Sequence, residues 1–180
     1  MPPQLHTEQQ VQEYLIQVFG PNQQHEIYPT QHGWVCRPVL TQEEIDRGQD
    51  LGLGNYVINK HTGVVTAHRS LPPHLIGEEF DEAIQTGQPV QGHQVYPPMW
   101  RVQIERTRET SEEIEYNVQA QSLTQPPEPP VQRQLVINKH TLRSRTNVPG
   151  IHHTCAQATA WAEWQSHRNG TWPQTGTFEF

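Results

Sequence analysis

The hexapeptide VINKHT occurs twice in this chain, at residues 57–62 and again at 136–141. It is either a ligand or catalytic motif used twice or the mark of a duplicated building block. The similarity extends further, because Leu40-Thr41-Gln42 matches Leu123-Thr124-Gln125. Each of these tripeptides is followed by a loop, the hexapeptide, a return strand, a proline-containing linker and a helical pattern. Such internal similarity predicts two related units of strand, strand, hairpin and helix.

Local patterns predict the elements of these units. Thr7 and Gln10 form a capping box, and the apolar residues that follow recur with helical spacing until Gly20. Alternation of apolar and polar residues and turn signals predict the strands. The predicted helices are 7–19, 74–86 and 152–167, and the predicted strands are 25–30, 33–40, 55–60, 64–70, 100–107, 113–123, 134–138 and 142–146. We expect 41–54 to be a loop, 87–98 a polar segment and 168–180 an irregular tail.

The fold class that these elements indicate is α+β, with two related antiparallel hairpin units and flanking helices that arose by internal duplication. We place the first unit at 1–90 and the second at 91–180, either as separate units or with one continuous sheet. The last helix should direct one apolar face to the core. That predicted face consists of Ile151, Cys155, Ala158, Trp161, Ala162 and Trp164.

Composition narrows the classes of partner. The 180 residues carry a formal net charge of -7, with no basic stripe, so we do not expect nucleic-acid binding. An acidic surface favours a basic protein partner. No apolar run is long enough to cross a bilayer and the first residues do not resemble a secretion signal, so we expect a soluble, cytoplasmic protein with no membrane partner. Two cysteines do not indicate a disulfide scaffold.

The hexapeptide has two interpretations. Asn, Lys and His together could hold a phosphate or act in acid–base chemistry. Alternatively, Asn and Thr suit a hairpin turn, with Lys and His in solvent. We favour the structural interpretation. His152, His153 and Cys155 lack the paired spacing of a zinc site, and Cys36 lies in an apolar strand. We therefore expect no catalytic residue, no metal and no cofactor.

The strongest charge feature is a set of carboxylates in the 41–54 loop and on the second helix. They form either a solvated face or a docking surface for a basic partner. The exposed aromatic residues Trp172, Phe178 and Phe180 could anchor an interface or cover the sheet. The predicted partner-binding residues are Glu43, Glu44, Asp46, Asp50, Glu78, Glu79, Asp81 and Glu82.

The first half resembles the bacterial immunity proteins with YrhB-like domains. The resemblance covers 7–86 and is carried by an N-terminal helix, the strand Gly33-Trp34-Val35, the stretch GLGNYVINKHTGVV and a helix after a proline linker. The matching positions are Trp34, Gly54, Val57, Thr62, Gly63 and Val64. Asn59–His61 stand where that family usually has an acidic residue.

The resemblance implies a small cytoplasmic antitoxin, monomeric before it binds, that blocks a cognate secreted toxin domain, for instance one that degrades NAD or nucleic acid. A second hypothesis is an enzyme or small-ligand binder that uses the two Asn-Lys-His tips, 59–61 and 138–140. A third is an accessory protein that oligomerises through sheet edges or the aromatic tail.

Overall fold

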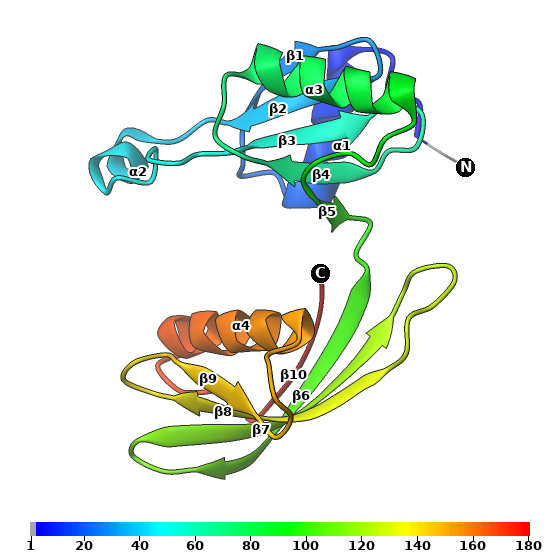
Figure 1. Cartoon of the computed structure of the whole chain (residues 1–180). Helices are drawn as coiled ribbons and strands as arrows, with labels where there is room; N and C mark the ends of the chain where they lie inside the picture. The colour runs from blue at the N-terminus through cyan, green and yellow to red at the C-terminus, as the bar shows by residue number, and fades with distance from the viewer. Residues whose placement is uncertain (1–2) are drawn as a thin grey trace. The chain divides into compact units, whose positions relative to one another are not determined.

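In the computed structural model, which describes residues 3–180, the chain divides into two compact units, Met1–Pro97 and Pro98–Phe180. Each unit contains one five-stranded antiparallel sheet; two helices pack against the first sheet and one against the second (Figure 1). The predicted α+β class is therefore confirmed. The strands form two separate sheets rather than one continuous sheet.

The first unit has a helix on each face of its sheet. Its strands follow the order β1-β2-β3-β4-β5. Trp34 and Cys36 of β2 face α1, whereas Val35 between them faces α3, as the period-2 alternation of a strand requires. The elements are α1 (Glu8–Phe19), β1 (His25–Pro29), β2 (Gly33–Pro38), α2 (Gln42–Asp46), β3 (Asn55–Asn59), β4 (Val65–His68), α3 (Pro73–Thr86) and β5 (His93–Tyr96).

The second unit has a single helix, which covers one face of a sheet with the order β10-β6-β7-β8-β9. Residues of β6, β7 and β8 alternate between this core and a polar face on the other side. The elements are β6 (Trp100–Glu109), β7 (Glu113–Ser122), β8 (Val131–Asn138), β9 (Ser144–Thr146), α4 (His153–Asn169) and β10 (Thr175–Glu179).

The two hairpins that carry VINKHT have the same register but opposite surroundings. Trp34 pairs with Ile58 in the first unit as Ile114 pairs with Ile137 in the second. Trp34 packs in the core beneath α1, whereas Ile114 packs in the core beneath α4. It follows that α3 and α4, although each follows an equivalent hairpin, cover opposite faces of their sheets. The correspondence between the units therefore ends at the hairpin, and their origin by duplication stays a prediction.

Two parts of the predicted core face of α4 are wrong. Ile151 is 43% exposed and Trp164 is 55% exposed. Cys155, Ala158 and Ala162 define the buried stripe, and Trp164, two positions beyond Ala162, points about 200° away from it. Ile151 lies ahead of the helix, whose N-cap is His152.

Three short elements lie where the sequence predicts none. They are α2 in the expected loop 41–54, β5 in the polar segment 87–98, and β10 in the expected tail 168–180. Strand β10 pairs with β6, and Trp172, Phe178 and Phe180 pack against the core of the second unit. These aromatic side chains therefore cover the sheet.

Candidate functional site

In the first unit, the VINKHT tip is a hydrogen-bonded turn built around Asn59. The Asn59 side-chain oxygen accepts from the main-chain N–H groups of His61 at 2.8 Å and Thr62 at 3.1 Å. The main-chain carbonyl of Asn59 also accepts from the Gly63 N–H at 2.9 Å. The Lys60 ammonium donates to the main-chain carbonyl of Thr30 in the β1–β2 turn. The tip is therefore tied to the neighbouring turn.

The second unit repeats this network with the matching residues. The Asn138 side-chain oxygen accepts from His140 at 3.0 Å and Thr141 at 2.8 Å. The Lys139 ammonium donates to the Thr110 carbonyl at 3.0 Å and to a Glu109 carboxylate oxygen at 2.9 Å. The nearby ammonium and guanidinium groups lower the pKa of Glu109, chiefly through the Lys139 hydrogen bond.

These contacts give the repeated hexapeptide a structural role. Its Asn side chains close the turn, as the structural interpretation of the sequence predicts. Its Lys side chains join two adjacent turns instead of lying in solvent, so that part of the interpretation is wrong. The His at each tip, His61 or His140, is exposed, as is the Thr that follows it. His140 lies 3.4 Å from a carboxylate oxygen of Glu112, with both side chains more than half exposed.

Several of the predicted partner-binding carboxylates are engaged within the first unit. Glu44 accepts from Thr41 in the capping box of α2, and these hydrogen bonds lower the pKa of the Glu44 carboxyl. Asp81 accepts from the Thr30 hydroxyl at 2.9 Å and from two main-chain N–H groups of the β1–β2 turn. Asp81 therefore holds α3 to that turn. Two others form ion pairs, Glu43 with Arg47 and Glu79 with Arg69.

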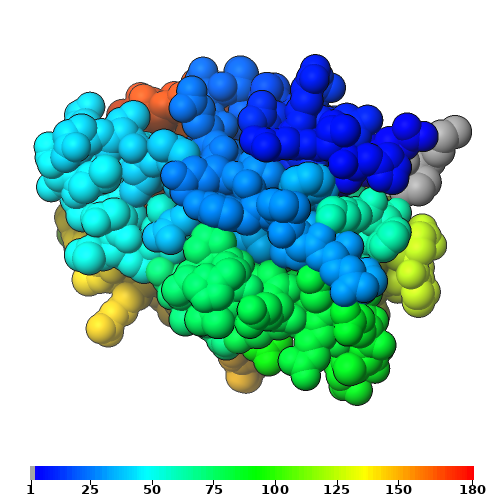
Figure 2. Space-filling view, turned by 90° about the horizontal axis from the view of Figure 1, so that it is seen from above, coloured from blue at the N-terminus to red at the C-terminus, as the bar shows by residue number. Residues whose placement is uncertain are grey.

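The remaining carboxylates separate into two groups. Asp46 and Asp50 belong to the connection 39–54 between β2 and β3, which we call the arm, and Glu78 and Glu82 lie on α3. Figure 1 shows the arm, with α2 near its tip, projecting beyond the end of the sheet, whereas α3 lies over the sheet face. In Figure 2 the arm forms the cyan lobe at the left edge. The eight predicted residues thus occupy two places.

Sequence reasoning missed the apolar side chains of the arm. Leu51 is 83% exposed, and Ile45 and Val39 are 41% and 42% exposed. They alternate with the carboxylates along the arm. The signal available in the sequence was the pair of leucines in DLGLG, within a stretch that otherwise indicates a polar loop.

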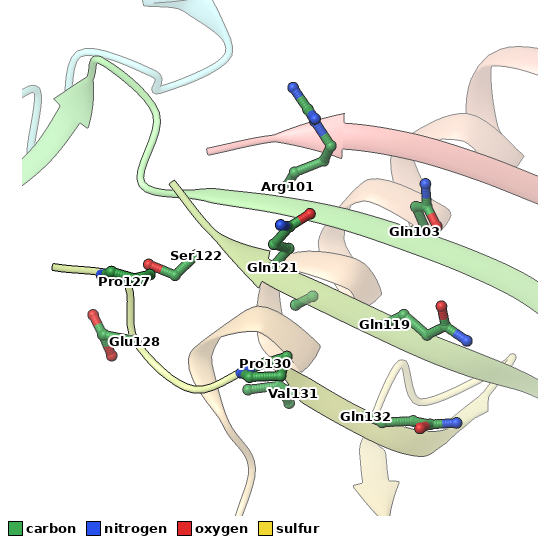
Figure 3. A pocket seen from close by; sticks show the side chains of 11 residues that line it. Arg101, Gln103, Gln119, Gln121, Ser122, Pro127, Glu128, Pro130, Val131 and Gln132 are labelled. Atoms are coloured by element: carbon green, nitrogen blue, oxygen red, sulfur yellow. The ribbon is translucent and has the colours of Figure 1, made fainter. Parts of the chain in front are cut away.

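The polar face of the second sheet is the other candidate surface. A hollow of about 560 Å³ is lined there by glutamine side chains of β6, β7 and β8 and by the proline-rich connection between β7 and β8. Figure 3 shows Gln103 on β6 and Gln119 and Gln121 on the neighbouring β7, with Pro127, Glu128 and Pro130 in the connection that follows β7. A smaller hollow of about 270 Å³ shares Gln103 and Gln119 with it.

Both cysteines are free thiols in the cores of their units. Cys36 and Cys155 have no exposed surface, and burial raises the pKa of the Cys36 thiol to about 12 and also raises that of Cys155. His152 caps α4, and its ring lies 4.2 Å from that of His153 and beside Trp100. Within residues 3–180, no group of three or more His, Cys, Asp or Glu side chains is arranged to hold a metal ion.

None of the helices described here is both long and apolar enough to cross a lipid bilayer.

Comparison with known proteins gives no match. No protein-family model matches the chain, and no curated protein or solved structure matches it either.

Proposed function

We propose that this protein binds a basic surface of another protein through the arm, residues 39–54. The observation that carries the proposal is the exposure of Leu51, 83%, at a projecting loop that also carries Asp46 and Asp50. Burial of one exposed leucine side chain contributes roughly 1.5–3 kcal/mol to binding. An apolar anchor of this kind with a charged surround is typical of a protein contact.

Charge complements the apolar contact. In the part of the chain that the structure describes, Asp46 and Asp50 of the arm form no ion pair with a basic side chain. The formal net charge of the protein is -7, which would speed its encounter with a basic partner. The arm therefore offers both a steering charge and an apolar contact.

The specific form that we propose is an immunity protein. The arm would cover the active site of a cognate toxin domain, and its carboxylates would take the place of the phosphates of NAD or of a nucleic acid. Such an inhibitor needs no chemistry of its own. The competing enzymatic hypothesis relies on the Asn-Lys-His tips, where Asn59, Lys60, Asn138 and Lys139 are engaged in main-chain hydrogen bonds.

The test is affinity capture with the tagged full chain from lysate and secretome of its own cells, followed by mass spectrometry. Four proteins are used in parallel: wild type, Leu51→Lys, the arm pair Asp46→Lys with Asp50→Lys, and the control pair Glu78→Lys with Glu82→Lys on α3. We expect a single protein that contains a toxin-like domain and is retained by wild type and by the α3 control but lost with both arm variants.

Purified partner then gives the decisive measurement. Leu51→Lys should weaken binding by at least tenfold, and added chain should inhibit the enzymatic activity of the partner in proportion to occupancy. Equal binding by wild type and Leu51→Lys would exclude the arm. A bound partner whose activity is unchanged would exclude the inhibitory function.

A further inference from the structure

We propose that the polar face of the second sheet, on the side away from α4, binds an extended peptide segment that is rich in uncharged polar residues and carries a basic residue near one end. This site lies on β6, β7, β8 and the 123–130 connection. It uses none of the residues of the arm, and the proposal stands whether or not the arm binds a partner.

The strand register arranges amide side chains in a row across this face. Gln103 of β6 pairs with Gln119 of β7, and Gln119 pairs with Gln132 of β8. Gln121, two residues further along β7, lies in the next row and pairs with Arg101. All four glutamines are exposed, whereas the residues between them in sequence point into the core.

The hydrogen-bonding capacity of these glutamines is unused within the fold. Among the residues described, the side-chain amides of Gln103, Gln119, Gln121 and Gln132 form no hydrogen bond with another protein group. A carboxamide presents N–H donors and a carbonyl acceptor, which are the groups that a peptide bond presents. The face can therefore pair with main-chain groups of a ligand as well as with polar side chains.

The spacing along the strand matches an extended chain. Side chains on one face of a strand recur at every second residue, about 6.4–6.8 Å apart. The alternate peptide groups of an extended ligand recur with the same spacing. A segment laid along β7 would therefore meet Asn117, Gln119 and Gln121 in step, and the hollows of about 560 and 270 Å³ lie along this line.

Charge and shape define the ends of the site. Arg101 is compensated by Glu179, with 2.8 Å between the guanidinium Nε and the carboxylate oxygen. Glu128, in the wall formed with Pro127 and Pro130, has no ion-pair partner in the described chain. Glu105, exposed on the same face in the smaller hollow, likewise forms no ion pair among the residues described. These carboxylates disfavour an anionic ligand, and we place a lysine or arginine of the peptide at the Glu128 end because the proline segment walls the hollow there.

The test uses random peptides displayed on phage, selected against the immobilised full-length chain. Selected peptides are synthesised with a fluorophore, and their Kd is measured by fluorescence polarisation. The variants are Gln119→Leu, Gln103→Leu and Glu128→Lys. The matched control is Gln157→Leu on the exposed side of α4, and Leu51→Lys reports on the arm. Circular dichroism checks that each variant is folded.

We expect selected peptides to contain a basic residue and few apolar ones. Gln119→Leu and Gln103→Leu should each raise Kd at least tenfold, Glu128→Lys should raise it several-fold in low salt, and Gln157→Leu and Leu51→Lys should leave it unchanged. The proposal is overturned if no peptide is selected, if the selected peptides bind Gln119→Leu as tightly as wild type, or if their consensus is acidic or apolar. Binding of a glycan array that is lost in Gln119→Leu, without peptide binding, would reassign the face to saccharides.

Discussion

The Lys139 ammonium and the main-chain carbonyl of Thr110 are joined by a hydrogen bond of 3.0 Å, across two neighbouring turns of the second sheet. Lys60 and Thr30 make the same connection in the first unit. The lysine of the repeated hexapeptide thus holds adjacent turns together. Because this lysine has a structural role, its replacement should lower the stability of the folded protein.

Replacement of Lys139 by Met should destabilise the second unit by about 1 kcal/mol, since the Lys139 side chain is only 20% exposed and makes two hydrogen bonds. Urea denaturation followed by tryptophan fluorescence measures the change. The matched control is His140→Ala, whose exposed contact with Glu112 should contribute less than about 0.5 kcal/mol. Equal effects of the two substitutions would contradict the structural role of Lys139.

Asp81→Asn should destabilise the first unit by roughly 1–3 kcal/mol, because the carboxylate accepts hydrogen bonds from one hydroxyl and two main-chain N–H groups. Glu82→Gln, at the next position on α3, should change stability by less than about 0.5 kcal/mol. Thermal denaturation of both variants tests this difference. If Asp81→Asn were as stable as wild type, the hydrogen bonds between Asp81 of α3 and the β1–β2 turn would not contribute to the free energy of unfolding.

The residue after the hexapeptide is Gly63 in the first unit and Leu142 in the second, and replacing each by the other residue type should affect stability to different extents. Gly63 has φ +75°, and a Cβ there would lie 2.5 Å from Pro3 Cγ and 2.9 Å from Tyr14 Oη. Gly63→Leu should therefore cost about 2 kcal/mol or more. Leu142 already adopts φ +59°, so Leu142→Gly relieves backbone strain while adding chain entropy to the unfolded state, and should change stability by less than about 1 kcal/mol. Equal effects in chemical denaturation would argue against this account.

His25 should make the first unit sensitive to mild acid. Burial lowers the pKa of His25 from 6.5, partly opposed by a main-chain hydrogen bond with Gln23. Between this lowered value and 6.5 the unfolded chain binds more protons than the folded one, so stability rises with pH. The contribution is complete above 6.5 and is lost as pH falls toward the folded-state pKa.

Denaturation of wild type and His25→Gln between pH 7.5 and 5 tests this, with the variant expected to show the shallower pH dependence. Loss of stability through Glu44, Glu109 and Glu113 belongs to a separate range below 4.5, because the pKa values of these carboxyls are lowered from 4.5. Identical slopes for the two proteins above pH 5 would show that His25 does not contribute.

Both thiols should be inert in the folded protein. Cys36 and Cys155 are fully buried, with pKa values raised by desolvation, so neither reacts readily as a thiolate. Labelling with a thiol reagent at pH 8 should proceed only after unfolding, and should then modify two cysteines per chain. Rapid labelling of the native protein would contradict the burial of these residues.

Local signals predicted most of the fold. The capping box at Thr7 and the periodicity after it fixed the first helix to within one residue, and the hexapeptide located both hairpins. The helix α2 was missed although Thr41 and Glu44 form a capping box, because five helical residues carry no periodic apolar stripe. Strands β5 and β10 depend on pairing with distant partners, which a single sequence does not display.

The candidate surfaces were less accessible to sequence reasoning. A run of carboxylates does not distinguish Asp81, which binds main-chain groups, from Glu82, which is exposed. The row of glutamines is invisible in the sequence because Gln103, Gln119 and Gln132 come from three strands and meet only through their register. Which face a helix covers is likewise decided by tertiary packing.

Because α3 and α4 cover opposite faces of their sheets, the same residue of the hexapeptide can be compared in two different surroundings. Val57 and Val136 occupy the same position in the two copies of the hexapeptide. Val57 is fully buried beneath α3, whereas Val136 is half-buried on the polar face of its sheet. An identical stretch of sequence therefore contributes core packing in one unit and a surface position in the other. Whether this valine is buried therefore depends on which face of the sheet a helix covers, and the hexapeptide itself does not decide it.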